Sequence, residues 1–143
     1  MKTILIVDDQ PLIQNHFSLI LDKLGYSSII ADDGLEAFEK TELHKVDLIF
    51  MDLQMPIMNG YEAAENLRKR NFKKPIIAVT ASDYSEEKEK CIRAGFDDIM
   101  IKPVKKIDIE NQRILVSVSN GDELHTGYVG LGKNFDTIEW VVE

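Results

Sequence analysis

The sequence has one cysteine, no long apolar run and fewer basic than acidic residues. A lone Cys91 excludes an internal disulfide and suits a reducing compartment. No apolar stretch approaches the ~18 residues of a membrane span, and the strand-like start after Met1 is not that of a signal peptide. The 17 basic and 25 acidic residues give a net charge of −8, which argues against direct nucleic-acid binding. We therefore expect a soluble, cytoplasmic protein or domain that binds neither membranes nor nucleic acid.

Strand-like and helix-like segments alternate up to about residue 110. The strand-like segments are short and mostly apolar, as the strands of a buried parallel sheet are. Apolar residues at helical spacing, with proline or glycine near the ends, predict helices between them. Five such steps imply one α/β domain with helices on both faces of a parallel sheet. Strands are expected at residues 3–7, 27–31, 46–51, 75–81 and 97–101, and helices at residues 11–24, 34–43, 60–70 and 84–94.

The C-terminal part of the sequence follows a different pattern. Residues 113–119 are rich in β-branched side chains, and Asn120-Gly121 is the favoured two-residue hairpin turn. Return strands are predicted at residues 124–129 and 135–142. We therefore divide the chain into a domain of residues 1–110 and a β-rich extension of residues 111–143. Since about 30 residues rarely fold alone, the extension is expected to pack on the domain or on a neighbouring chain, the latter giving a homodimer.

Polar side chains lie at the carboxyl ends of four predicted strands. Asp8 and Asp9 follow the first strand and Asp52 follows the third. Thr80 ends the fourth, and Lys102 follows the fifth. Parallel strands bring these ends to one edge, where open α/β sheets bind their ligands. Two carboxylates ~4 Å apart repel by about 4 kcal/mol at an effective dielectric near 20. Because a divalent cation or a proton relieves this repulsion, the pattern predicts a Mg²⁺–carboxylate site with one carboxylate free to act as a nucleophile.

The residues around these positions resemble the receiver domain of two-component response regulators. The resemblance covers residues 1–105 and implies a flavodoxin-like, doubly wound, five-stranded parallel sheet of order 2-1-3-4-5. The segments that carry it are Ile-Leu-Ile-Val-Asp8-Asp9, Met-Asp52-Leu-Gln-Met-Pro-Ile-Met-Asn-Gly60, Val-Thr80-Ala and Ile-Lys102-Pro103.

The resemblance also implies a role for each residue. Asp52 would accept a phosphoryl group from the phosphohistidine of a histidine kinase or a histidine phosphotransfer protein. Lys102 would contact Asp52 and the phosphoryl group, and Thr80 would move to hydrogen-bond it. The resulting change of conformation would signal to a downstream protein, with no enzymatic activity beyond the chain's own phosphorylation and dephosphorylation. The groups expected to bind Mg²⁺ are Asp8, Asp9, Asp52 and the backbone carbonyl of Gln54.

The sequence departs from the receiver pattern in several places. Ile99 stands three residues before the expected lysine, where receivers usually carry a Tyr or Phe that rotates on activation. Gln54 and Ser82 occupy positions that set the lifetime of the phosphorylated state in the family. Residues 107–112 allow about two turns of the fifth helix, which we therefore expect to be short or atypical.

The resemblance also implies a backbone feature next to the site. The Lys102-Pro103 peptide bond is expected to be cis, as in the family.

Other interpretations stay open. A degenerate receiver that only binds proteins would share the fold, although the complete set of site residues argues against it. An aspartyl-phosphate phosphatase of the haloacid dehalogenase type also uses an aspartate at a strand end and Mg²⁺. That family needs a second aspartate two residues further on, where this chain has Gln54. A flavin-binding protein is disfavoured because no hydroxyl- or glycine-rich phosphate loop follows the first strand.

Overall fold

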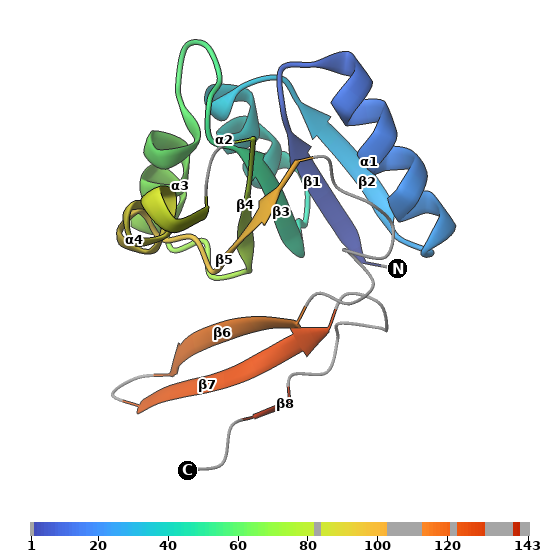
Figure 1. The fold of residues 1–143 in the computed structure, drawn as a ribbon. Coiled ribbons are helices and arrows are strands. Elements are labelled where there is room, and N and C mark those ends of the chain that lie inside the picture. Colours follow the sequence, from blue (N-terminus) through green and yellow to red (C-terminus); the bar gives the residue numbers. More distant parts are fainter. Residues whose placement is uncertain (1, 82–83, 103–112, 121–122, 131–138, 141–143) are drawn as a thin grey trace. The chain divides into compact units, whose positions relative to one another are not determined.

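The computed structural model describes residues 2–81, 84–102, 113–120, 123–130 and 139–140 (Figure 1). The chain divides into two compact units, Met1–Pro103 and Val104–Glu143. Each unit has its own sheet. The division that we predicted at residue 110 stays a prediction.

The first unit contains a five-stranded, wholly parallel sheet of order β2-β1-β3-β4-β5. This confirms the predicted topology, and each strand lies within two residues of its predicted position. The strands are β1 (Thr3–Val7), β2 (Ser27–Ala31), β3 (Leu48–Asp52), β4 (Ile76–Thr80) and β5 (Asp98–Ile101), and the helices are α1 (Pro11–Lys23), α2 (Gly34–Leu43), α3 (Gly60–Lys69) and α4 (Tyr84–Ala94).

The core forms because the central strands are apolar on both faces. Every residue of β3 and β4 is buried, as expected for a parallel sheet covered on both sides. On one face α1 packs against the sheet, with the Phe17 ring 5.1 Å from that of Phe50. On the other face α2, α3 and α4 form a second apolar layer that includes Ala37, Leu67 and Cys91. Figure 1 shows these helices on the two sides of the sheet.

The helix ends follow local capping rules. Asp33 precedes α2, and its side chain accepts a hydrogen bond from the Glu36 N–H at 2.8 Å. Asn59 caps α3 in the same way, accepting from the Glu62 N–H at 2.9 Å. These caps satisfy N–H groups that the first helical turn leaves unpaired. They fix where each helix leaves the carboxyl edge of the sheet.

A half-buried arginine joins the elements at the opposite, amino-terminal edge of the sheet. The Arg68 guanidinium of α3 donates to the Gly95 carbonyl at 3.0 Å and lies 2.9 Å from the Asp97 carboxylate. The same Asp97 oxygen accepts the Ile76 N–H at 2.9 Å. Burial raises the pKa of Asp97, and the Arg68 charge acts in the opposite direction. This network joins α3, β4 and the turn before β5, and so holds the strands that reach the carboxyl edge.

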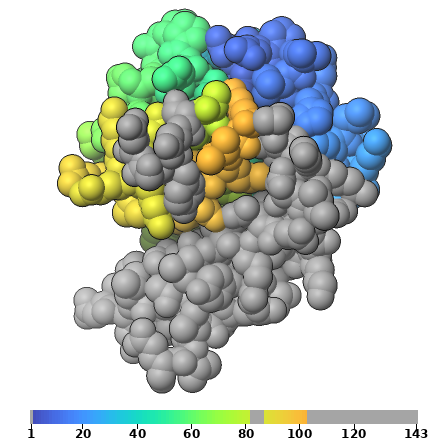
Figure 2. Space-filling model, in the orientation of Figure 1, coloured from blue at the N-terminus to red at the C-terminus, as the bar shows by residue number. Residues whose placement is uncertain are grey.

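The surfaces of α4 and β5 lie next to each other in the space-filling view (Figure 2). Ile92 of α4 and Ile101 of β5 are both exposed. Ile99, in contrast, is buried in the apolar layer below. Within the described residues, no helix is both long and apolar enough to span a membrane.

The second unit is a three-stranded antiparallel sheet of order β6-β7-β8. It comprises β6 (Arg113–Asn120), β7 (Glu123–Gly130) and β8 (Glu139–Trp140). The pairing of Asn120 with Glu123 confirms the two strands of the predicted hairpin. Several predictions lie outside the described residues: the short fifth helix at 107–112, the cis peptide bond before Pro103, the turn residue Gly121 and the role of Ser82.

Candidate functional site

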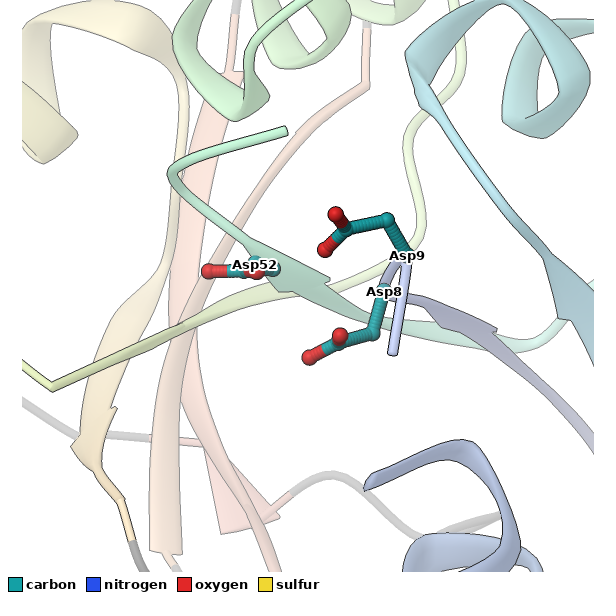
Figure 3. Close-up of side chains that lie close together, drawn as sticks. All are labelled: Asp8, Asp9 and Asp52. Atoms are coloured by element: carbon teal, nitrogen blue, oxygen red, sulfur yellow. The ribbon is translucent and has the colours of Figure 1, made fainter. Parts of the chain in front are cut away.

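Three carboxylates meet at the carboxyl edge of the first sheet. Asp8 and Asp9 follow β1 and Asp52 ends β3, and one oxygen of each lies within 4.8 Å of the others. Figure 3 shows Asp8 and Asp9 extending from the end of β1 toward the side where Asp52 lies. Asp8 and Asp52 are 2% and 7% exposed, whereas Asp9 is open to solvent. The structure therefore brings these three carboxylates together at the edge where the parallel strands β1 and β3 end.

Lys102 bridges two of these carboxylates. Its ammonium nitrogen lies 3.0 Å from Asp8 Oδ2 and 3.4 Å from Asp52 Oδ2. Burial is the largest influence on Asp52 and raises the pKa of its carboxyl; Lys102 opposes this shift, and the charge of Asp8 adds to it. The ammonium therefore pairs with two of the three carboxylates, and the cluster keeps an excess of negative charge that a further cation would balance.

Backbone groups hold the two buried carboxylates in place. The Gln10 N–H donates to Asp8 Oδ1 at 2.9 Å, and the Gln54 N–H donates to Asp52 Oδ1 at 3.3 Å. Each carboxylate is therefore held by a backbone N–H at one oxygen and by an ammonium at the other. Their rotamers are fixed before any ligand arrives, which reduces the reorganisation that binding would require.

Thr80 lies at the same edge, buried at the end of β4. Its carbonyl accepts the Lys102 N–H at 2.7 Å. The end of β4 is thereby coupled directly to the residue that bridges the carboxylates. The structure thus brings together Asp8, Asp9, Asp52 and Lys102 through side chains, and places Thr80 beside them through the backbone.

The loop after β3 folds back onto Asp52. The Gly60 N–H donates to the Leu53 carbonyl at 3.0 Å, and a Cβ at position 60 would lie only 2.3 Å from the Asp52 carbonyl oxygen. Glycine is therefore required by close backbone approach. Within the same loop Ile57 has φ 68° and the Met58 N–H donates to the Pro56 carbonyl at 2.7 Å. A β-branched residue with positive φ is strained, and this strain sits five residues after Asp52.

The cluster fits a small, hard divalent cation. Its donors are carboxylate oxygens, two of them already fixed, and one side opens to solvent at Asp9. Mg²⁺ prefers such a site, in which a few carboxylates leave room for water and phosphate oxygens. Beside the carboxylates lies an open cleft of about 730 Å³ lined by Asp9, Leu53, Gln54, Met55, Pro56, Asn59, Tyr61, Glu87 and Lys90.

One residue at the site escaped the sequence prediction. Gln14 of α1 is buried, and its side-chain amide donates to the Asp8 carbonyl at 2.5 Å. The available signal was its position, since Gln14 lies three residues before Phe17 on the inward face of an amphipathic helix. A polar residue at an inward position needs a buried partner, but the helix pattern does not say which.

Residues 4–113 match the family model of the response regulator receiver domain. The chain belongs to this family. Receiver domains are modules of phosphorelay signalling rather than classical enzymes, and they bind Mg²⁺ at their acidic pocket. The family assignment agrees with the acidic cluster, the bridging lysine and the sheet order described above.

Individual relatives support the same family. The sensor histidine kinase RcsC of Salmonella typhimurium is 34% identical over 113 residues, which is 79% of this chain and 12% of that protein. The receiver domain of sensor histidine kinase PA1611 from Pseudomonas aeruginosa PAO1, solved with a magnesium ion coordinated in its active site cleft, is 34% identical. Its TM-score is 0.69, and the match covers 76% of this chain and 90% of that one.

A third similar structure contains a signalling partner. It is the co-crystal structure of the Saccharomyces cerevisiae histidine phosphotransfer signaling protein Ypd1 with the receiver domain of its downstream response regulator Ssk1. The match has 34% identity and a TM-score of 0.68, and it covers 73% of this chain and 80% of that chain.

Proposed function

We propose that the chain is a Mg²⁺-dependent phosphoacceptor in which Asp52 receives a phosphoryl group from a phosphohistidine. The observation that carries this proposal is the bridging of Asp8 and Asp52 by Lys102, at 3.0 and 3.4 Å, within a cluster of three carboxylates. Such an arrangement supplies a fixed nucleophile and a fixed positive charge at the same place. Phosphoryl transfer depends mainly on that kind of positioning and charge neutralisation.

The chain's own residues account for the transfer step. An oxygen of Asp52, held by Lys102 and the Gln54 N–H, attacks phosphorus as the phosphorus–nitrogen bond to the donor breaks. The donor ring, protonated on its other nitrogen, leaves as neutral imidazole, and Asp52 becomes an acyl phosphate. Lys102 then pairs with a phosphoryl oxygen in place of one carboxylate. Asp8, Asp9, Asp52 and the Gln54 carbonyl would hold Mg²⁺, which would neutralise charge on the phosphoryl oxygens.

Phosphorylation would act as a switch through charge. It adds about −1.5 to −2 charges and three acceptor oxygens at Asp52. The Thr80 hydroxyl at the end of β4 and the Lys102 ammonium just after β5 would pair with these oxygens. Because the Lys102 N–H already donates to the Thr80 carbonyl, the two strand ends would move together. The new electrostatic contacts would thereby favour a different conformation of the loops around the site, and a partner would recognise this conformation.

The proposed donor is a histidine kinase or a histidine phosphotransfer protein. The similarity to RcsC and to the Ypd1–Ssk1 structure supports this class of partner. Leu12, in the first turn of α1, is 80% exposed, and Leu19 of the same helix is also exposed. These leucines offer apolar contacts on α1 to such a partner. Since the chain spans only 12% of RcsC, the activity of any longer protein around it belongs to the same proposal.

The test is intact mass after incubation with acetyl phosphate and Mg²⁺. Wild type should gain one phosphoryl adduct, and Asp52→Asn should gain none. Asp22→Asn, which removes an exposed carboxylate of α1 away from the site, is the matched control and should be labelled like wild type. A chelator should abolish labelling. Wild type that binds Mg²⁺ but gains no adduct would contradict the proposal and support a receiver that only binds proteins.

Turnover separates the proposal from the phosphatase interpretation. A phosphatase of the haloacid dehalogenase type would release phosphate continuously from a phosphate monoester. The position that would hold its general acid is Gln54, whose side-chain amide cannot act as a general acid. We therefore expect a single phosphorylation event, and steady hydrolysis of a monoester would contradict this.

A further inference from the structure

Gln14 makes two hydrogen bonds beneath the carboxylate cluster. Its side-chain nitrogen lies 2.5 Å from the Asp8 carbonyl oxygen and 2.6 Å from Asp32 Oδ1. Both partners are acceptors, so the amide nitrogen must face them and both of its N–H groups are used. The side chain is 7% exposed, so water offers little alternative to these bonds.

These bonds complete a set of contacts that fix Asp8. Its backbone N–H donates to the Ala31 carbonyl at 3.1 Å. Its carboxylate oxygens are held by the Gln10 N–H at 2.9 Å and by Lys102 at 3.0 Å. The carbonyl is held by Gln14. Both polar groups of the Asp8 main chain and both carboxylate oxygens therefore have a partner.

The Asp8 carbonyl also determines where Asp9 lies. A peptide group is planar, so the direction of the Asp8 carbonyl sets the position of the Asp9 nitrogen and Cα. Asp9 lies between β1, which ends at Val7, and α1, which begins at Pro11. The orientation of this peptide plane thus sets the point from which the Asp9 side chain extends toward Asp52.

We propose that Gln14 is a positioning residue for the divalent cation site. Its amide holds the Asp8–Asp9 peptide plane so that the Asp9 carboxylate stays within reach of Asp8 and Asp52. The inference rests on the proposed function, because it concerns the same Mg²⁺ site. Gln14 is neutral, so its loss changes no charge, and the effect comes from the mobility of Asp9. Residues that orient metal ligands in this way change metal affinity by about 10- to 100-fold when replaced.

A purely structural role is the competing explanation. Gln14 also joins α1 to Asp32 at the start of the β2–α2 connection, so replacing it will loosen the fold. A structural effect would lower stability and leave the affinity of the folded protein for cations unchanged. Cation affinity measured well below the unfolding transition therefore separates the two explanations.

The experiment is a titration of the full chain with Mn²⁺, followed by electron paramagnetic resonance of free Mn²⁺, with Mg²⁺ as competitor. Gln14→Met keeps the length and helix propensity of the side chain but removes both donors. We expect its affinity for both cations to fall by about 10-fold or more. Gln14→Asn keeps an amide but shortens the side chain by one methylene, so the amide no longer reaches the Asp8 carbonyl. It should show the same loss of cation affinity, and it replaces Gln14→Met in the test if that variant does not fold.

Two controls on the same helix complete the design. Asn15→Ala changes an exposed neighbour, and Ile20→Val weakens the buried face of α1 without touching the site. Both should bind cations like wild type. If folded Gln14→Met also binds like wild type, the inference is wrong and the proposed function stands. If wild type itself binds neither cation, both are wrong.

Discussion

Replacing Gly60 by alanine tests the link between the β3–α3 loop and the phosphoacceptor. The new Cβ would lie 2.3 Å from the Asp52 carbonyl oxygen and 2.9 Å from Leu53 Cα. Both are backbone atoms, so no side-chain rotation relieves the contact and the loop must move. Overpacking of this kind costs typically 1–3 kcal/mol. Alanine is otherwise favoured over glycine in a helix by about 0.5–1 kcal/mol. Because both contacts are with backbone atoms, we take the upper end of the first range, about 3 kcal/mol, and expect a net loss of about 2 kcal/mol in the free energy of unfolding.

Gly34→Ala is a matched control, since Gly34 is buried and is the first residue of α2, as Gly60 is of α3. Its new Cβ would lie 2.9 Å from Met58 Cγ and from Ala63 Cβ. The methionine side chain can rotate away and the alanine needs only a small shift between helices, so we expect a loss nearer 1 kcal/mol.

Urea unfolding of both variants, with chelator present, measures these costs. Labelling by acetyl phosphate adds a second readout, because only the Gly60 contact displaces the backbone of Asp52. Gly60→Ala should be labelled more slowly than wild type, and Gly34→Ala should not. A Gly60→Ala protein as stable as Gly34→Ala, and labelled at the wild-type rate, would refute the argument that the loop is pinned against Asp52.

Three further predictions concern the charges and the strain at the site. Asp52→Asn should raise the free energy of unfolding at neutral pH, because burial raises the pKa of Asp52 and the folded state resists its charge. The folded state binds the Asp52 proton more tightly than the unfolded state does, so this gain in stability should shrink as pH falls through the raised pKa. Urea unfolding in chelator at neutral and acid pH checks this expectation. A gain in stability that grows on acidification would contradict it. Lys102→Met leaves Asp8 and Asp52 without their shared cation, so in chelator it should unfold at a lower temperature than wild type. In thermal melts, Mg²⁺ should raise the unfolding temperature of this variant more than that of wild type. An equal rise in the two proteins would argue against the cation site. Ile57→Asn should stabilise the protein by about 1 kcal/mol, because asparagine tolerates positive φ. The Ile57 side chain is 80% exposed, so its replacement removes little packing. Unchanged stability in urea unfolding would show that the turn is not strained.

The fold and the main site residues were predictable because they depend on local patterns. An apolar run followed by aspartate marks the end of a buried parallel strand, and this rule places Asp8, Asp9 and Asp52 at one edge. The start of the third strand differs from its prediction. β3 begins at Leu48 rather than at residue 46, and the carboxylate of Asp47 just before it accepts the Thr3 N–H at 2.9 Å.

The interactions that the sequence did not reveal join residues from separate elements. Gln14 of α1 reaches the end of β1 and the residue after β2, and Arg68 of α3 reaches Gly95 and Asp97. No spacing rule within one helix names partners on other elements. Only the register of the strands and the position of each helix over the sheet determine these contacts.

Ile99 limits how the proposed switch can work. It is buried among apolar residues that include Cys91 and Phe96, at the position where receivers usually carry a rotating aromatic ring. A β-branched aliphatic side chain in a packed core has few alternative rotamers and no polar group to expose. Movement of Thr80 would therefore have no ring to displace. The direct route is the hydrogen bond from the Lys102 N–H to the Thr80 carbonyl, which couples the ends of β4 and β5. Under the proposed mechanism, phosphorylation would be expressed in the loops at this edge rather than in the packing of β5.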